Sequence, residues 1–160
     1  MKVGIGFDVH RLKEGRKFWL AGIEIAHLKG ADGHSDADVI IHAICDALLG
    51  AANLGDIGIH FPDNSSEFKD IDSKILLKRV CKLLIENKYT IGNIDTTVCL
   101  QSPKISSYIP SMKHTLASVM EINEDKISIK ATTTEKLGFI GREEGVSCYA
   151  IALIQYAESK

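Results

Sequence analysis

Several features that would place the chain in a familiar class of protein are missing from its sequence. The formal net charge is -2 with 25% charged residues, so no basic excess is present to attract nucleic acid or an anionic membrane. No apolar run approaches the roughly 20 residues that a transmembrane helix needs, and the first residues read as a strand rather than a signal segment. These absences predict a cytoplasmic protein that binds neither nucleic acid nor membrane.

The four cysteines, Cys45, Cys81, Cys99 and Cys148, form no C-x-x-C pair. They are widely spaced and lie within apolar patterns, so we expect free buried thiols rather than disulfides or a thiolate metal site. The chain has 160 residues, and no internal repeat, low-complexity tract or linker is visible. We therefore expect residues 1–160 to form a single domain.

Hydrophobic spacing predicts strands and helices that intermix around one core. Period-two patterns predict strands at 2–10, 89–100, 126–131 and 146–156, and a hairpin over 17–25. Helical spacing predicts helices at 35–52, 72–87 and 107–120. We expect an α/β fold of the α+β type, a single domain with a mixed sheet and helices packed on one face.

The other face of this sheet also needs a cover. The segment 148–156 is apolar almost throughout, which indicates burial on both sides of the last strand. Sheet faces that pack together in an oligomer would provide that burial. A monomer with one very short additional layer is the alternative.

Three side chains suggest a metal site. Alternation over 2–10 predicts a strand with one buried face, from which Asp8 and His10 project to the same side, and His42 lies in the first predicted helix. One carboxylate and two imidazoles match a Zn2+ site with three protein ligands and an open fourth position. In the alternative interpretation Asp8 caps a turn, His10 lies on the surface and His42 is a hydrogen-bonded core residue.

The first predicted helix carries a polar stripe. Ser35, Asp38, His42 and Asp46 recur at steps of three and four, with Ser35 as the expected N-cap. Asp46 is expected to accept the second ring N–H of a ligand histidine. Asp38 faces either the site or solvent. His34 and Ser35 stand at the expected helix start, where free N–H groups and the helix dipole attract phosphate.

A second polar cluster follows a predicted strand. Thr132, Thr133 and Thr134 offer consecutive hydroxyls to phosphate oxygens, and the carboxylate of Glu135 suits a hard divalent ion. This pattern predicts a diphosphate site, although a run of threonines is also typical of plain strand.

Two loops and one arginine complete the candidates. The segment 53–66 is rich in Gly, Asp, Asn and Ser, and loops of this length are often functional. The segment 100–106 is a turn between a strand and a helix. Arg142 pairs either with phosphate or with Glu143 or Glu144.

These motifs resemble the 2-C-methyl-D-erythritol 2,4-cyclodiphosphate synthase family of the non-mevalonate isoprenoid pathway. The resemblance covers essentially the whole chain and rests on His42 and on the segments 6–10, 33–38, 46–52, 54–58, 61–63, 103–104, 130–139 and 141–142. It implies that 4-diphosphocytidyl-2-C-methyl-D-erythritol 2-phosphate is cyclised with release of CMP. The departures are small: Ala37 stands where Gly is frequent, Ser102 varies, and Glu143 adds an acid beside Arg142.

The resemblance also implies a role for each matching residue. The Zn2+ ligands, or ligands of another divalent transition metal, are Asp8, His10 and His42, with Asp46 behind them, and the Mg2+ or Mn2+ ligand is Glu135. The catalytic residues are His34 and Thr133. The substrate-binding residues are Asp8, His10, His34, Ser35, Asp56, Gly58, Phe61, Asp63, Leu100, Gln101, Ser102, Pro103, Lys104, Ile105, Ser106, Thr132, Thr133, Thr134, Glu135, Phe139 and Arg142.

Family members are homotrimers with active sites between neighbouring subunits. The resemblance further implies a central cavity in which Phe7, Arg142 and Glu144 hold an isoprenoid diphosphate. Two other functions fit parts of the pattern. One is a non-catalytic trimer that binds isoprenoid diphosphate or metal. The other is a metal-dependent phosphohydrolase in which Asp56 or Asp38 activates water.

Overall fold

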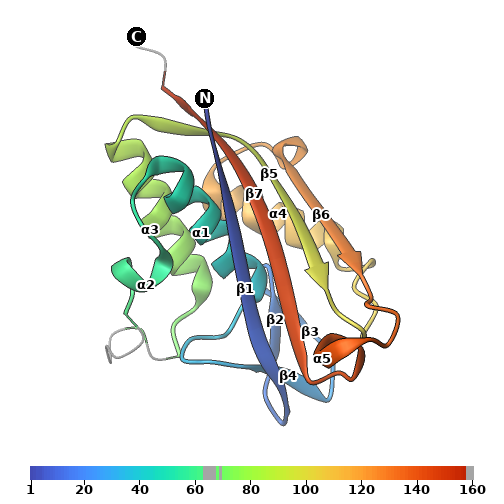
Figure 1. The fold of residues 1–160 in the computed structure, drawn as a ribbon. Coiled ribbons are helices and arrows are strands. Elements are labelled where there is room, and N and C mark those ends of the chain that lie inside the picture. Colours follow the sequence, from blue (N-terminus) through green and yellow to red (C-terminus); the bar gives the residue numbers. More distant parts are fainter. Residues whose placement is uncertain (63–67, 69, 158–160) are drawn as a thin grey trace.

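The structure is a computed structural model that describes residues 1–62, 68 and 70–157. Its strands are β1 (Lys2–Glu14), β2 (Phe18–Leu20), β3 (Ile23–Ile25), β4 (Lys29–Asp32), β5 (Tyr89–Cys99), β6 (Ile127–Thr132) and β7 (Gly145–Tyr156). Its helices are α1 (Val39–Ala52), α2 (Ile57–His60), α3 (Ser73–Glu86), α4 (Ile109–Met120) and α5 (Gly138–Gly141), with a 3-10 turn η2 (Glu124–Lys126). These elements form an α+β domain with a mixed sheet, as predicted (Figure 1).

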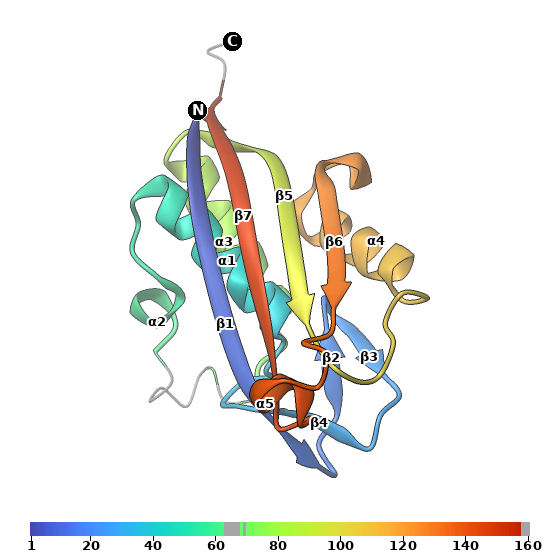
Figure 2. The same ribbon diagram turned by 45° about the vertical axis from the view of Figure 1, so that its right-hand side comes forward.

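In the described part of the chain, five strands form a sheet in the order β4-β1-β7-β5-β6. Figure 2 shows β1, β7, β5 and β6 side by side. The β5 and β6 strands are parallel, whereas β1 is antiparallel to both β4 and β7, and β7 to β5. The predicted hairpin is present as β2 and β3, which pair with each other.

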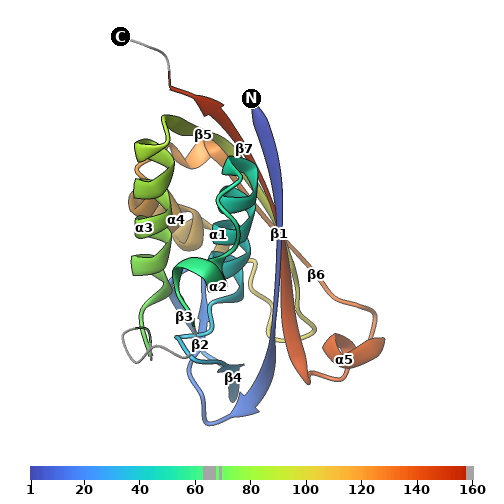
Figure 3. The same ribbon diagram turned by 60° about the vertical axis from the view of Figure 1, so that its left-hand side comes forward.

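The helices α1, α3 and α4 cover one face of the sheet, and the opposite face is open in the single chain (Figure 3). Exposed apolar side chains of β1 and β7 lie on this open face, with exposed fractions between 43% and 70%. We call them the open-face patch: Val3, Ile5, Phe7, Val9, Tyr149 and Ile151.

The open-face patch shows which sides of β1 and β7 are buried within one chain. The buried side of β1 carries Gly4 and Gly6 rather than apolar side chains, because α1 lies directly against these glycines. The last strand is likewise buried on one side only, since Tyr149 and Ile151 are exposed. Within one chain, the second cover that the sequence indicated is therefore absent from the described residues.

Helix α1 begins at Val39, with Asp38 as its N-cap, so the expected cap at Ser35 is wrong. The carboxylate of Asp38 accepts from the N–H groups of Ile40 and Ile41, and also from those of Ala21 and Gly22 in the hairpin turn. Asp38 is fully buried by these contacts, so it is neither a solvated surface residue nor a side chain of the polar stripe. Its carboxylate fixes the start of α1 against the hairpin.

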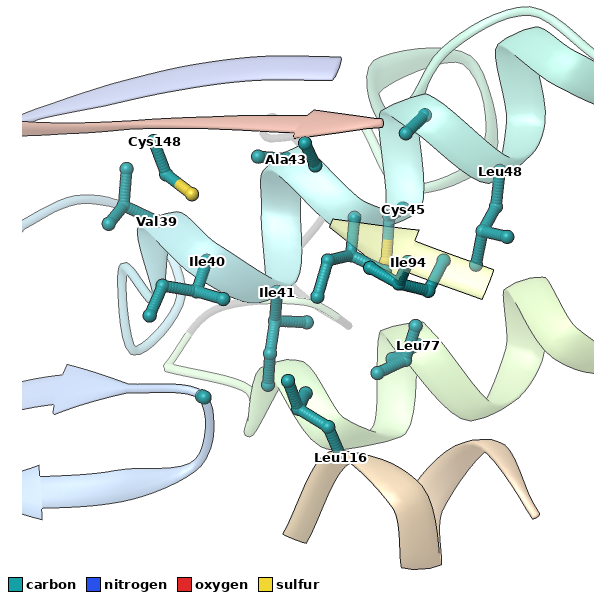
Figure 4. Close-up of a cluster of buried hydrophobic side chains, with 14 of the residues drawn as sticks. Val39, Ile40, Ile41, Ala43, Cys45, Leu48, Leu77, Ile94, Leu116 and Cys148 are labelled. Carbon is teal, nitrogen blue, oxygen red and sulfur yellow. The ribbon is translucent and has the colours of Figure 1, made fainter. Parts of the chain in front are cut away.

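The core surrounds α1, which is buried on almost every side. Figure 4 shows Ile41 and Leu48 of α1 pointing toward α3 and α4, where Leu77 and Leu116 lie. Cys148 of β7 lies on the opposite side of the helix. Because α1 is held from all sides, a side chain that it presents to the sheet is placed with little freedom.

The predicted helices at 72–87 and 107–120 and the predicted strands at 89–100, 126–131 and 146–156 agree with the structure to within a few residues. The first strand runs on to Glu14, beyond its predicted end at residue 10, and β4, α2, α5 and η2 were not predicted. Helix α3 begins after its N-cap Asp72, and α4 carries Pro110 in its first turn. The four cysteines are free thiols, as expected, although Cys99 is only half-buried. Among the residues that the structure describes, no helix is both long and apolar enough to span a membrane.

Candidate metal centre and active site

Asp8, His10 and His42 converge at the middle of β1 and the first turns of α1. The Oδ2 atom of Asp8 lies 2.9 Å from Nε2 of His10 and 3.0 Å from Nδ1 of His42. The two ring nitrogens are 3.2 Å apart. The alternation of β1 brings Asp8 and His10 to the helix side of the sheet, and α1, which packs on that side, supplies His42.

This donor set fits a divalent transition metal ion. Ligands of a tetrahedral ion at about 2.0–2.1 Å lie roughly 3.3 Å from one another, close to the separations found between these three atoms. The three side chains are largely buried, with exposed fractions of 23%, 16% and 12%. The interpretation in which the three residues are unrelated is therefore wrong, because they form one cluster.

Charge in the metal-free cluster is concentrated on Asp8 and His42. Burial raises the pKa of Asp8, but hydrogen bonds with His10 and His42 outweigh burial and lower the pKa below its ordinary value. Burial lowers the pKa of His42, but the hydrogen bond with Asp8 and the nearby carboxylates outweigh it and raise that pKa. Asp8 thus favours a cation at this point, whether a proton on His42 or a metal ion.

The outer nitrogen of His42 has a different partner from the one expected. Nε2 of His42 lies 2.9 Å from the hydroxyl of Ser73 and 3.2 Å from that of Ser35. The expected partner Asp46 instead accepts from the N–H of Ile57 at 2.8 Å, because the start of α2 packs against α1 there. Asp46 therefore ties α2 to α1, which corrects its predicted place behind the ligand histidines.

Sequence reasoning missed Ser73 because it lies 31 positions after His42, at the start of another helix. It also missed Asp36, whose carboxylate contacts Ser73. No local pattern points to this contact, since it depends on how α3 packs against α1.

The expected anion site at a helix start near His34 and Ser35 is not formed. The helix begins later, and Asp38 already accepts from the N–H groups of Ile40 and Ile41. Ser35 nevertheless reaches the metal centre through its contact with His42. The backbone carbonyl of His34 accepts from the N–H of Asp70 at 2.8 Å, which holds this loop in place.

The loop that precedes α3 is described in part. Asp56 caps α2 by accepting from the N–H of Ile59 at 3.0 Å, and Gly58 lies within that short helix. The ring of Phe61 packs against that of Phe68, with 5.5 Å between centroids. Asp63 lies outside the described residues.

The threonine segment and the turn 100–106 form one hollow. A cavity of about 200 Å³ is lined by Leu100, Gln101, Pro103, Lys104, Ile105, Ser106, Ala131, Thr132 and Thr133. The N–H of Leu100 donates to the carbonyl of Thr132 at 2.9 Å, and the N–H of Lys136 to the side chain of Gln101 at 3.2 Å. Two segments that the sequence treated separately thus share one site, whereas Ser102 does not line the cavity.

The hydroxyls of the threonine segment are engaged locally. Thr133 Oγ1 donates to Oε1 of Glu135 at 2.8 Å, and Thr134 Oγ1 to the carbonyl of Leu137 at 2.7 Å. Glu135 and Lys136 both have a left-handed backbone, with φ of 52° and 65°. This turn presents Glu135 next to the hydroxyl of Thr133, at the edge of the cavity.

Within one chain, the metal centre and the threonine segment are well separated. Asp8 pairs with Cys148, Cys148 with Val98, and Val98 with Ala131, so three strand spacings lie between β1 and β6. At about 4.8 Å per spacing this is roughly 14 Å. One chain therefore does not bring Asp8 and Thr132 to the same small ligand.

The structure also shows the contacts of the residues that the resemblance assigned to a central cavity. Arg142 donates to both carboxylate oxygens of Glu144, each at 3.0 Å, so Glu144 rather than Glu143 is its carboxylate partner. The ring of Phe7 contacts that of Tyr149 in the open-face patch, with 4.8 Å between centroids. Phe139 lies on α5 and is 42% exposed.

A larger hollow of about 890 Å³ lies elsewhere, between α3, α4 and β5. None of the predicted site residues lines it. We place the active site at the metal centre and the smaller cavity, because the clustered donors and hydroxyls lie there.

Comparison with known proteins decides the family. The YgbB family matches residues 1–155. A curated 2-C-methyl-D-erythritol 2,4-cyclodiphosphate synthase of Bacteroides fragilis is 65% identical over 154 residues, covering 96% of this chain and 97% of the relative. The chain belongs to the YgbB family. The resemblance stated from the sequence, and the synthase reaction that it implied, are confirmed.

Solved structures also match this chain, at lower sequence identity. The bifunctional IspDF from Campylobacter jejuni matches with a TM-score of 0.95 and 43% identity over 98% of this chain. This chain spans only 42% of that bifunctional protein. The IspF of Plasmodium falciparum, solved as a CDP complex, matches with a TM-score of 0.86 and 36% identity, covering 98% of this chain and 97% of that one.

Proposed function

We propose that this YgbB-family protein converts 4-diphosphocytidyl-2-C-methyl-D-erythritol 2-phosphate to 2-C-methyl-D-erythritol 2,4-cyclodiphosphate and CMP. The observation that carries the proposal is the convergence of Asp8, His10 and His42 in a chain 65% identical to a curated synthase. An oxygen of the 2-phosphate attacks the β-phosphorus of the same substrate. The bond from that phosphorus to the bridging oxygen breaks, and CMP leaves with this oxygen.

The reaction needs no nucleophile from the protein, because substrate supplies it. The protein must align attacking and leaving oxygens and neutralise their charge. Asp8, His10 and His42 would hold Zn2+ or another divalent transition metal, and Glu135 would hold Mg2+ or Mn2+. Bound there, such cations supply charge stabilisation for phosphoryl transfer.

The other residues bind and orient the substrate. The cytidine would occupy the cavity lined by the turn 100–106, a proposal supported by the CDP complex of the Plasmodium falciparum relative. Thr132, Thr133 and Thr134 would donate to the diphosphate, and Thr133 lies beside Glu135, the proposed ligand of the second cation. His34 would orient the 2-phosphate for attack.

Further residues enclose the methylerythritol part of the substrate. Ser35 lies beside His42 and would bind this part next to the metal. Asp56, Gly58, Phe61 and Asp63 would close over it from the loop that follows α1.

We place this function in a homotrimer with active sites between subunits. The separation of roughly 14 Å between β1 and β6 supports this arrangement, because the metal centre of one chain can then meet the threonine segment of its neighbour. The open-face patch supports it too, since its exposed apolar side chains need a cover. We further propose that Phe7, Arg142 and Glu144 line a central cavity of this trimer that holds an isoprenoid diphosphate, as the resemblance implies. To bind such a ligand, Arg142 would exchange its contact with Glu144 for phosphate.

Phosphorus NMR tests the reaction directly. The purified protein is incubated with the substrate, Zn2+ and Mg2+, and the same mixture with a chelator is the control. We expect CMP and the cyclic diphosphate in equal amounts only where metal is present. Zinc binding without either product would indicate a binding protein instead. Metal-dependent phosphate release from simple nucleoside diphosphates would indicate a phosphohydrolase.

A further inference from the structure

The outer face of the metal centre is closed by a residue from a distant helix. Ser73, the first residue of α3, has no exposed surface, and its hydroxyl lies 2.9 Å from Nε2 of His42. His42 therefore has Asp8 and His10 on one side of its ring and Ser73 on the other.

The direction of each hydrogen bond follows from the groups present. The hydroxyl of Ser73 makes a short contact with Oδ1 of Asp36, and the N–H of Ser73 donates to Oδ2 of Asp36 at 2.9 Å. Both carboxylate oxygens of Asp36 accept from Ser73, so the single hydroxyl proton of Ser73 is directed at Asp36. The hydroxyl oxygen of Ser73 can then only accept from His42, which requires a proton on Nε2 of His42. The hydroxyl of Ser35 lies 3.2 Å from the same nitrogen and is the longer of its two contacts.

This chain of donors fixes the tautomer of His42. A neutral imidazole with its proton on Nε2 has its lone pair on Nδ1, the atom that faces Asp8 and His10. That is the form needed to bind a metal between these three side chains. Partners of this kind on a ligand histidine raise its basicity and hold its ring in place.

Two backbone hydrogen bonds next to the contact between Ser73 and Asp36 hold the loop beside the metal centre. The N–H of Asp36 donates to the carbonyl of Ile71 at 3.1 Å, and the N–H of Asp70 donates to that of His34 at 2.8 Å. The segment 34–36 is thus held along the segment 70–73. These bonds tie the residues assigned to the substrate phosphate to the entry of α3.

We propose that Ser73 and Asp36 are positioning residues of the metal centre. They set the tautomer and ring orientation of His42 and fix the 34–36 loop against α3. The inference rests on the proposed metal role of His42 and adds to it two residues that do not touch the metal.

Zinc affinity measured by competition with a chromogenic chelator tests the proposal, with the visible spectrum of the Co2+ form as a second readout. Ser73→Ala removes the hydroxyl but leaves the α3 cap, because Asp72 still accepts from the N–H of Lys74. We expect zinc affinity to fall roughly 10- to 100-fold and the Co2+ spectrum to change. Ser73→Thr keeps the hydroxyl and should recover most of the loss. Ser118→Ala, on the exposed side of α4, is the matched control and should leave both readouts unchanged.

The outcomes separate this inference from the metal assignment. Native zinc affinity in a folded Ser73→Ala protein would overturn the positioning role while leaving the metal centre intact. Absence of zinc binding by the native protein would overturn the metal assignment, and the positioning role with it. If Ser73→Ala does not fold, Asp36→Asn provides the test, because its amide cannot accept both bonds from Ser73. Unchanged zinc affinity in folded Asp36→Asn would overturn the proposal equally.

Discussion

Gly6 of β1 lies so close to Ala43 of α1 that a Cβ atom on Gly6 would stand 1.9 Å from the carbonyl oxygen of Ala43. Gly4 meets the next turn of the helix in the same way, at 2.0 Å from the carbonyl oxygen of Ala47. The helix can therefore lie directly on the strand, which lets His42 reach Asp8 at hydrogen-bond distance. The two glycines set the spacing of the metal centre.

Gly6→Ala should push α1 away from β1. We expect a loss of stability of about 1–3 kcal/mol from overpacking, together with weaker zinc binding because His42 moves away from Asp8. Urea unfolding and chelator competition measure the two effects. Gly50→Ala is the matched control, since a Cβ there meets nothing nearer than 4.0 Å. Equal zinc affinity in the two variants would contradict this account of the spacing.

The sequence predicted most elements because their patterns are local. Hydrophobic spacing located α3 to within one residue of its start, and the same reasoning found the hairpin and most of the strands. It misplaced the start of α1 because Asp38 caps the helix while also bonding to Ala21 and Gly22, which are remote in sequence. Local pattern cannot show which of several polar residues the fold will bury.

The candidate site also contains residues that local patterns predict and residues that only tertiary packing brings together. Asp8, His10 and His42 were predicted as a cluster, because a strand and a helix each present their side chains with a known period. Ser73 was missed because its contact depends on the packing of α3 against α1. The sequence did not indicate which side of β1 is buried, since glycine at a close helix contact gives no hydrophobic signal.

Ile5→Asp should dissociate the proposed trimer. Ile5 is 70% exposed at the centre of the open-face patch, and a carboxylate buried there without a partner is costly. We expect light scattering to give the mass of a monomer and synthase activity to be lost with the shared sites. Ile85→Asp provides the control, because Ile85 is 69% exposed on α3, which covers the opposite face of the sheet from the open-face patch. A trimer that survives Ile5→Asp would remove the open-face patch as the interface.

The metal-free protein should become less stable as pH rises toward neutrality and above. The folded pKa of His42 is raised above 6.5, so its stabilising contribution is full below 6.5 and is lost as pH rises through the folded value. The folded pKa of Asp8 is lowered below 3.8, so its contribution is full above 3.8 and is lost only in stronger acid. Both contributions are full between these two values.

Thermal unfolding in a chelator, from about pH 5 to about pH 9, measures this dependence. Asp8→Asn should flatten the slope, because it removes the partner that raises the pKa of His42. Zinc should reverse the trend, since a neutral His42 is the form that binds metal. If the stability of the metal-free native protein rises over this range, groups other than the Asp8–His42 pair set the pH dependence of stability.

Mixed trimers should regain activity from two inactive chains. His42→Ala removes a metal ligand and Glu135→Gln removes the proposed ligand of the second cation, so each variant alone should be inactive. If a site takes its metal centre from one chain and its threonine segment from the neighbour, random assembly of equal amounts leaves about a quarter of the sites intact. Co-refolding the two variants and assaying CMP release measures that fraction.

A mixture of His42→Ala with Asp8→Asn is the control and should stay inactive, because every chain then carries a damaged metal centre. Activity no higher in the first mixture than in the second would place each site within a single chain. That result would contradict the argument from the roughly 14 Å that separates β1 from β6.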